Sequence, residues 1–223
     1  MALGGGVFVT QNKKLPGAYM VFVSKARASA ALSDRGVCTM PLELDWGQED
    51  EVFTVTNEAF RKDSMKIFGY GADDEKMKGL GDLFMNARVL HAYRLNGGGE
   101  KAANDFATAL YSGVRGNDLK IVIQANVDDE SLYDVHTYLG TTLVDSQTVK
   151  TAADLAANEY VKFKADAVLE VTASTPLAGG TNKAADGAAH QKYLDKIESF
   201  SFNVMAVTAE QETIRKMYVS FCR

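Results

Sequence analysis

The chain has 223 residues, of which 46% are hydrophobic and 24% are charged, and its formal net charge is -5. This composition is typical of a globular protein and disfavours intrinsic disorder. No apolar run approaches the roughly 20 residues that a membrane-spanning helix needs, and no secretory signal opens the chain. The negative net charge disfavours a nucleic-acid-binding surface, which would need a basic patch. We therefore expect a cytoplasmic protein of two lobes that binds neither membrane nor nucleic acid.

The first 24 residues predict an extended arm, because alternating and β-forming residues follow three glycines without helical periodicity. Such an arm needs backbone partners, and these are either the sheet edge of another subunit or an internal edge strand. The candidate arm residues are Val7, Phe8, Val9, Tyr19, Val21 and Val23. Residues 1–40 also hold five basic residues and one acidic residue, so Lys13 and Lys14 are candidate contacts to an acidic neighbour.

Residues 36–95 alternate between strand and helix patterns. A strand is predicted over 52–55, and Thr56 or Asn57 can cap a helix that runs to about residue 68. A second helix over 73–86 places Met77, Leu80, Leu83 and Phe84 on one face. A strand over 89–95 follows, and the glycine cluster after Asn96 ends this region.

Residues 104–175 predict short strands throughout, over 106–111, 119–123, 133–138, 142–149, 160–164 and 168–171, with a brief helix at 151–158. A flexible connection over 176–189 leads back to a helix with Tyr193, Leu194 and Ile197 on one face, and to a strand over 200–207. Thr208 and Gln211 then form a capping box for a last helix. Because the apolar face of this helix continues to the end of the sequence, we expect the chain to be truncated at its C-terminus.

The pattern as a whole predicts an α+β fold, a sandwich-like α/β core with an inserted all-β domain and an extended N-terminal arm. The predicted boundaries are 1–24 for the arm, 25–100 with 186–223 for the discontinuous core, and 101–185 for the β domain.

Residues that could carry chemistry are few. Gly97–Gly99 follows a strand, so a phosphate-binding loop must be weighed against an interdomain hinge, but neither a P-loop nor a G-x-G-x-x-G register is present. No serine elbow or paired histidine spacing occurs, and the hypothesis is a protein with no catalytic residues, no cofactor and no metal. Cys38 and Cys222 are expected to be small buried residues. The acidic residues Glu43, Asp45, Glu49, Asp50 and Glu51 are expected to form a solvated surface.

Trp46, the single tryptophan, lies where a predicted strand runs into the acidic loop. An exposed tryptophan there could anchor a protein interface, whereas a buried one would belong to the core. Both interpretations stay open at this point.

Several stretches together resemble a known family. MALGGG at residues 1–6, LPGAY at 15–19, DRG at 34–36 and PLELDWG at 41–47 resemble the N-terminal region of tail sheath proteins from Firmicutes phages and phage-tail-like particles. YSGVRGNDL at 111–119 resembles a turn-strand motif of many sheath proteins. The resemblance spans essentially the whole chain, and the order and spacing of the stretches make it fairly specific.

The resemblance implies a contractile sheath of stacked rings around an inner tube, in the tail of a phage, prophage or bacteriocin-like particle assembled in the host cytoplasm. The implied partners are other copies of the sheath protein, the inner tube protein, and the baseplate and tail terminator proteins. Terminal arms that extend a partner's sheet would join neighbouring copies. Family members continue past residue 223, and the further portion supplies the tube-facing surface and a second arm.

Two other hypotheses remain. The first is an α/β enzyme or nucleotide-binding module that uses the Gly97–Gly99 loop. The second is an adhesive module that uses the β domain and would need clustered exposed aromatic residues.

Overall fold

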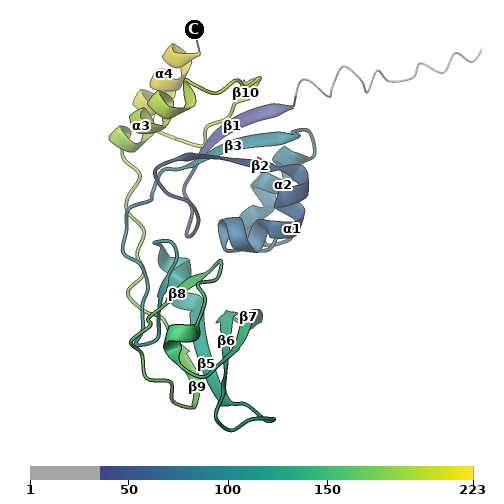
Figure 1. Ribbon diagram of the computed structural model, residues 1–223. Coiled ribbons are helices and arrows are strands. Elements are labelled where there is room, and N and C mark those ends of the chain that lie inside the picture. The colour runs from purple at the N-terminus through teal and green to yellow at the C-terminus, as the bar shows by residue number, and fades with distance from the viewer. Residues whose placement is uncertain (1–35, 223) are drawn as a thin grey trace, which may run out of the picture. The chain divides into compact units, whose positions relative to one another are not determined.

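The computed structural model describes residues 36–222 (Figure 1). Helices and strands are mixed along the chain, which confirms the prediction of an α+β fold. The strands form a four-stranded sheet A, a two-stranded sheet B and a four-stranded sheet C. None of the helices in the described range is long and apolar enough to cross a lipid bilayer.

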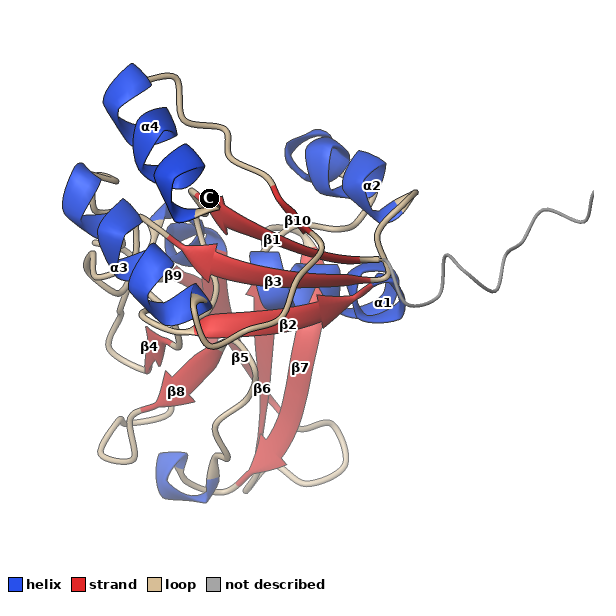
Figure 2. Cartoon of the chain, turned by 90° about the horizontal axis from the view of Figure 1, so that it is seen from above, coloured by secondary structure: helices blue, strands red, loops and turns tan. Residues whose placement is uncertain are grey.

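Sheet A contains β10 (Val204–Met205), β1 (Val37–Leu42), β3 (Val89–Arg94) and β2 (Val52–Thr56), in that order. Strand β1 is parallel to β3 and β10, and β2 is antiparallel to β3. Figure 2 shows β1, β3 and β2 side by side. Since Cys38 pairs with Leu90 on one side and Val204 on the other, sheet A joins segments from both ends of the described chain.

The side chains of β3 alternate between two apolar clusters. Leu90 and Ala92 pack with helices α1 (Asn57–Phe68) and α2 (Lys78–Phe84), whereas Tyr93 packs with α3 (Gly187–Ile197) and α4 (Glu212–Phe221). Because successive side chains of a strand point to opposite faces, the two helix pairs cover opposite faces of sheet A. Both faces of the sheet are therefore covered by helices (Figure 1).

Helix α1 begins and ends where its sequence predicts. The Thr56 hydroxyl accepts a hydrogen bond from the Ala59 backbone N–H at 3.1 Å, and Gly69, with φ of 79°, ends the helix in the left-handed conformation. The helix predicted at 73–86 is shorter, because Asp74 caps a 3-10 turn, η2 (Glu75–Met77), that leads into α2. The capped 3-10 turn replaces the predicted first turn, and α2 itself contains Gly79 and Gly81, which lower its helix propensity.

The prediction for the last elements needs two corrections. The strand expected over 200–207 contains only the two residues of β10. Helix α4 begins at Glu212 after Gln211, which makes no side-chain cap, so the predicted capping box at Thr208 is wrong. The amphipathic face is nevertheless as predicted, since Ile214 and Tyr218 are buried.

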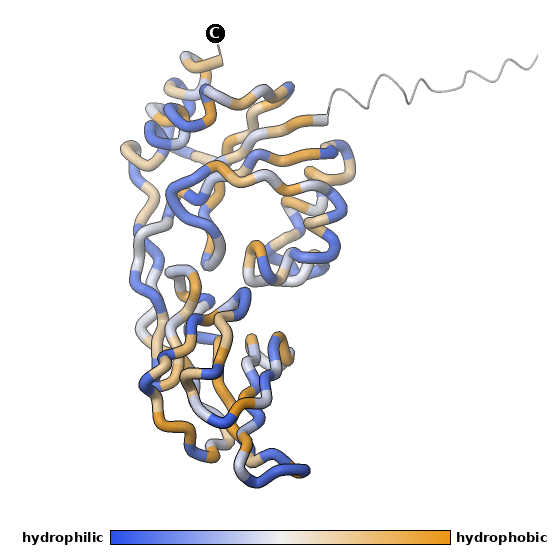
Figure 3. Tube along the Cα trace, in the orientation of Figure 1, coloured by the Kyte–Doolittle hydropathy of each residue, from blue (hydrophilic) through white to orange (hydrophobic). Residues whose placement is uncertain are grey.

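Residues 107–176 form the β part of the chain. Sheet C has the order β7 (Thr142–Val149), β6 (Tyr133–Leu139), β5 (Leu119–Ala125) and β9 (Thr172–Pro176), and sheet B pairs β4 (Ala107–Ala109) with β8 (Val161–Phe163). Two 3-10 turns, η3 (Val114–Asp118) and η4 (Ala152–Asp154), complete it. The apolar core contains Ile121, Ile123, Val135 and Leu139, all at most 3% exposed. The β5–β6 turn is hydrophilic (Figure 3) and carries Asp128.

One predicted strand is displaced. Residues 168–171 are not a strand, and β9 lies over residues 172–176 instead. Val168 and Val171 are exposed, and only Leu169 of this stretch is buried. The hydrophobic pattern suggested a strand, but the antiparallel pairing of β9 with β5 falls on the more polar residues that follow.

Two chain connections link this β part to sheet A, over residues 95–106 and 177–186, and they are hydrogen-bonded to each other. Ala103 and Ala178 exchange backbone hydrogen bonds of 2.9 and 3.1 Å. The Thr181 N–H donates to the Glu100 carbonyl, and the Lys183 N–H donates to the Asn96 carbonyl, both at 3.1 Å. The two connections therefore run as a paired ribbon.

Candidate functional site

The predicted arm lies outside the described residues. This applies to Val7, Phe8, Val9, Tyr19, Val21 and Val23, and to the basic residues Lys13 and Lys14. Their role in contacts between subunits stays a prediction.

Trp46 is buried within the chain, with only 1% of its surface exposed. Its ring stands edge-on to Tyr111 at 5.3 Å between centroids and stacks on Tyr160 at 6.3 Å. The indole N–H donates to the Lys66 carbonyl at the end of α1, at 3.1 Å. The interpretation of Trp46 as an interface residue between subunits is therefore wrong, because its contacts are already made inside one chain.

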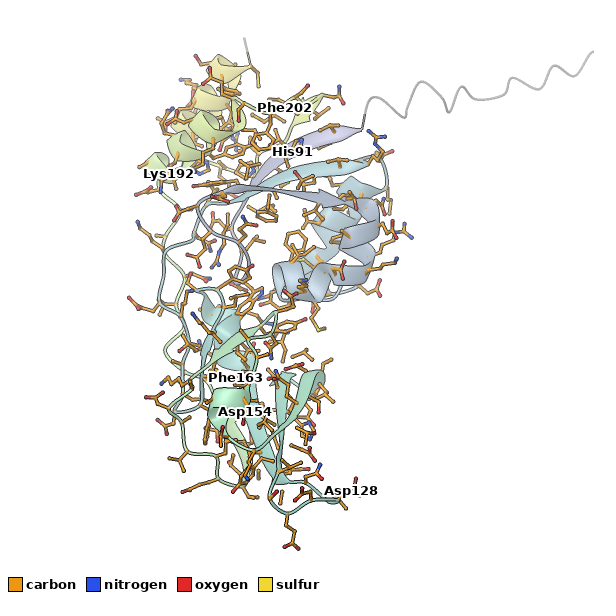
Figure 4. All side chains as sticks on the ribbon, in the orientation of Figure 1. His91, Asp128, Asp154, Phe163, Lys192 and Phe202 are labelled. Atoms are coloured by element: carbon orange, nitrogen blue, oxygen red, sulfur yellow. The ribbon has the colours of Figure 1, made fainter. Side chains whose placement is uncertain are left out.

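The acidic loop, residues 43–51, is not the solvated surface that its sequence predicts. The Asp45 carboxylate accepts hydrogen bonds from Tyr70 at 2.8 Å, Lys76 at 2.6 Å and Asn182 at 2.8 Å. Glu43 and Glu51 are exposed, as expected, but Asp45 and Glu49 are half-buried. Asp50 pairs at 2.8 Å with Lys192, which is labelled in Figure 4. Three of the five carboxylates therefore hold other parts of the chain.

Glu49 binds backbone amides of the β part and of the first connection. One carboxylate oxygen accepts from the Ser112 N–H at 2.8 Å, and the other accepts from the Gly98 N–H at 2.7 Å. Arg94 approaches the same carboxylate at 3.8 Å. The loop is thus fixed to chain segments about 50 and 63 residues further along.

Arg94 is the central cation of this junction and is 1% exposed. Its Nη1 donates to the carbonyls of Ser112 at 2.9 Å and Gly47 at 3.1 Å. Its Nη2 donates to Asn182 Oδ1 at 3.3 Å, and its Nε lies 3.4 Å from Asn96 Oδ1. A buried guanidinium costs free energy unless its donors are satisfied, and these partners supply acceptors from several segments.

The pKa values of the two carboxylates reflect this setting. For Asp45, burial raises the pKa, but the hydrogen bonds from Lys76, Tyr70 and Asn182 outweigh burial and lower it overall. For Glu49, burial likewise raises the pKa, and the hydrogen bonds from Ser112 and Gly98 with the charge of Arg94 lower it overall. Both side chains are therefore held in their charged form.

Sequence reasoning did not find Arg94, Ser112 or Asn182. A usable signal existed for Arg94, since it continues the buried register of Leu90 and Ala92 along β3. A charged residue in such a register requires partners. For Ser112 and Asn182, neighbours in sequence give no comparable signal, because their partners lie 18 to 137 residues away.

Three groups near Gly97–Gly99 that could bind an anion are bound to carboxylates of the same chain. Glu49 accepts from the Gly98 N–H, Asp50 pairs with Lys192, and Asp186 caps α3 by accepting from the Ala189 N–H at 2.9 Å. The loop leads into the paired connection and β4 rather than into a helix. In a phosphate-binding loop the glycines open a helix, whereas here the nearby helix N-terminus, that of α3, is capped by Asp186.

The histidines and cysteines are dispersed. His91 lies in β3, His136 in β6 and His190 in α3, where its Nδ1 lies 2.6 Å from the Tyr218 hydroxyl. Within residues 36–222 no group of histidine, cysteine and acidic side chains could hold a metal ion. Cys38 is half-buried, but Cys222 is exposed near the end of α4, so the expectation that both are buried is wrong for Cys222.

Comparison with known proteins identifies the chain. Residues 35–95 match the tail sheath protein Gp18 domain III N-terminal region, and residues 96–182 match the phage tail sheath protein beta-sandwich domain. The chain belongs to the phage tail sheath proteins. The first match contains β1 to β3 with α1 and α2, and the second contains β4 to β9.

Related proteins agree with this assignment. This sheath chain is 32% identical to the phage-like element PBSX protein XkdK of Bacillus subtilis and 30% identical to the uncharacterized protein YqbK of the same organism. Each alignment covers 99% of the chain and 52% of the relative, so the chain spans about half the length of the curated relatives it matches.

Solved structures give the same family. The sheath tail protein of Desulfitobacterium hafniense matches with a TM-score of 0.78 and 34% identity, over 92% of this chain and 48% of that one. The sheath tail protein Lin1278 of Listeria innocua matches with a TM-score of 0.72 and 30% identity, over 86% and 46%. The sheath chain thus shares its fold with about half of each of these two sheath tail proteins.

Proposed function

We propose that this chain is a structural, non-catalytic subunit of a contractile tail sheath, which polymerises around an inner tube and shortens to drive that tube through a target envelope. The observation that carries the proposal is the pair of sheath-domain matches, which together run from residue 35 to residue 182. The likeness to two sheath tail structures supports it. The carboxylates that occupy the anion-binding groups near Gly98 argue against a nucleotide-binding module.

The proposed partners are other copies of the chain, the inner tube protein, and the baseplate and tail terminator proteins. The proposed location is a virion tail or phage-tail-like particle assembled in the bacterial cytoplasm. We further propose that residues 1–24 are the arm, that 25–100 and 186–223 form one discontinuous domain, and that 101–185 form an inserted domain. Head-to-tail contacts of this kind generate open helical arrays rather than closed rings alone.

The proposal is tested through the arm. A donated strand binds through its backbone N–H groups, so Val21→Pro removes one donor and fixes an unsuitable φ, while Val21→Thr keeps both the donor and the β propensity. Light scattering and negative-stain imaging would be applied to the intact chain, to these two variants and to a chain that lacks residues 1–24.

We expect concentration-dependent oligomers, rings or tubes for the intact chain and Val21→Thr, and smaller species for Val21→Pro and the deletion. Monodisperse monomers of all four chains would contradict arm-mediated assembly by these residues. Assembly that persists without residues 1–24 would place the contact elsewhere.

A further inference from the structure

The junction between sheet A and the β part is polar, whereas the regions on either side have apolar cores of their own. We call residues 36–95 and 183–222 the core lobe, and residues 96–182 the β lobe. The core lobe holds two apolar clusters, around Leu90 and around Tyr193, and the β lobe holds a third around Ile121. Trp46 is the one core-lobe residue fully buried in the β-lobe cluster.

The most buried polar contacts across the junction depend on a few side chains. Glu49 and Arg94, both of the core lobe, bind the backbone of Ser112 in the β lobe. Asn182, at the end of the β lobe, binds Asp45 and Arg94 of the core lobe. Its side-chain oxygen also accepts from the Val114 N–H at 3.3 Å.

Loss of one partner in this network leaves charged or amide groups buried without their hydrogen bonds, which costs free energy. This cost arises only while the junction stays closed. Opening the junction lets water satisfy these groups. Neither lobe has to expose the main part of its own apolar cluster for this to happen. The balance between closed and open junction is therefore set by the polar network, by the contacts of Trp46 and by those of Arg115 with Gly69 and Tyr70. The exposed Lys66–Glu159 ion pair and the packing of Met65 against the β-lobe cluster add to it.

We propose that the Arg94, Glu49, Asp45 and Asn182 network is a latch, whose opening releases the β lobe from the core lobe while both lobes stay folded. The paired connections at residues 95–106 and 177–186 would keep the released lobes tethered.

The chain carries its own reporters of such an opening. Trp46 is the single tryptophan and contacts Tyr111 and Tyr160 of the β lobe, so its fluorescence responds when the junction opens. Arg115 of the β lobe is half-buried at the junction, where its Nε donates to the Gly69 carbonyl of the core lobe at 2.8 Å. Opening of the junction would expose Arg115 to trypsin, and the masses of the fragments would report cleavage there.

The test compares Glu49→Gln and Asn182→Ala with the parent chain and with Glu51→Gln, which makes the same chemical change at an exposed position of the same loop. Urea unfolding would be followed by Trp46 emission and by far-UV circular dichroism, and trypsin fragments would be identified by mass. For Glu49→Gln and Asn182→Ala, we expect Trp46 emission to shift at lower urea than the circular dichroism signal. We also expect at least about tenfold faster cleavage at Arg115, because a hydrogen bond to a charged group is lost and the junction opens more often.

Glu51→Gln should behave as the parent chain. Coincident transitions in every variant, or unchanged cleavage rates, would overturn the latch. Loss of the circular dichroism signal in Glu49→Gln and Asn182→Ala without urea would also overturn it, because the network would then be required for folding of the lobes themselves.

Discussion

Among single residues, the glycines of the 97–99 cluster have different structural tasks. A Cβ on Gly99 would lie 1.9 Å from the Thr181 carbonyl oxygen, across the paired connections. A Cβ on Gly97 would meet only the Glu49 side chain, at 3.1 Å. Backbone cannot move aside as a side chain can, so the close approach of the connections depends on Gly99.

We predict that Gly99→Ala lowers the free energy of unfolding by about 2 to 3 kcal/mol, as overpacking against backbone does, and Gly97→Ala by less than about 1 kcal/mol. Gly71→Ala is the control, because no atom lies within 4 Å of its Cβ position. Urea unfolding of the three variants measures the difference. Equal stabilities for Gly97→Ala and Gly99→Ala would contradict the structure at this ribbon.

The acidic loop illustrates what sequence patterns miss at the residue scale. A run of carboxylates is usually solvated, and Glu43 and Glu51 follow that rule. Asp45 and Glu49 depart from it because Ser112, Gly98 and Asn182, remote in sequence, supply donors. Periodicity reports which face a residue occupies, but it does not report which distant group meets it there.

At the scale of elements, local signals predicted what local interactions determine. Helix α1 carries its own cap at Thr56 and its own terminating glycine, and both ends agree with the prediction. The start of α4 does not agree, because the helix begins after Gln211 without the predicted side-chain cap. The position of β9 does not agree either, because its pairing with β5 decides it. Strand β9 is defined by its antiparallel register with β5, in which Thr175 pairs with Ile121. Its side chains are less hydrophobic than Val168 and Val171, which stay exposed.

The packing of α3 against α4 depends on a buried pair, His190 and Tyr218. Burial lowers the pKa of His190 below its ordinary value of 6.5, although the charges of Glu43 and Asp186 oppose this. The unfolded chain therefore binds more protons than the folded chain near and below pH 6.5. Stability from this residue is present above that pH and is lost as the pH falls.

We predict that the parent chain loses stability between about pH 7 and pH 5, and that His190→Gln loses less over the same interval. Tyr218→Phe serves as the control, because it removes the hydroxyl but keeps the buried histidine, so it should lower stability while keeping the pH dependence. The measurement is urea unfolding across this pH range. His91 has a pKa lowered in the same direction by burial, so some dependence should persist in His190→Gln.

At the scale of the whole molecule, the topology makes sheet A depend on residues far apart in the sequence. Strand β1 pairs with β3 and with β10, and the Cys38–Val204 pair spans the entire β part. Sequence patterns predicted that the strand-and-helix region resumes after the β part. Patterns alone do not give the register of β1 with β10, since parallel pairing leaves no turn signal between the strands.

We predict that a chain lacking residues 187–223 loses its cooperative thermal transition in the core lobe. Tyr93 and Leu95 would lose Tyr193, Leu194, Ile197 and the α4 side chains that cover them. Circular dichroism during heating and binding of a hydrophobic dye measure this. A sharp transition within a few degrees of the parent, with no added dye binding, would show that α3 and α4 are dispensable for sheet A.

The two paired connections have a mechanical consequence. A lobe attached by one flexible segment can swivel in any direction, whereas a lobe attached by two segments that lie side by side is restrained in twist. Because the backbones of Ala103 and Ala178 are hydrogen-bonded to each other, the two connections bend together as a two-stranded ribbon. When the latch opens, we expect the β lobe to rotate mainly about one hinge axis that crosses this ribbon. The reverse rotation should bring the Ser112 backbone back to the Glu49 carboxylate.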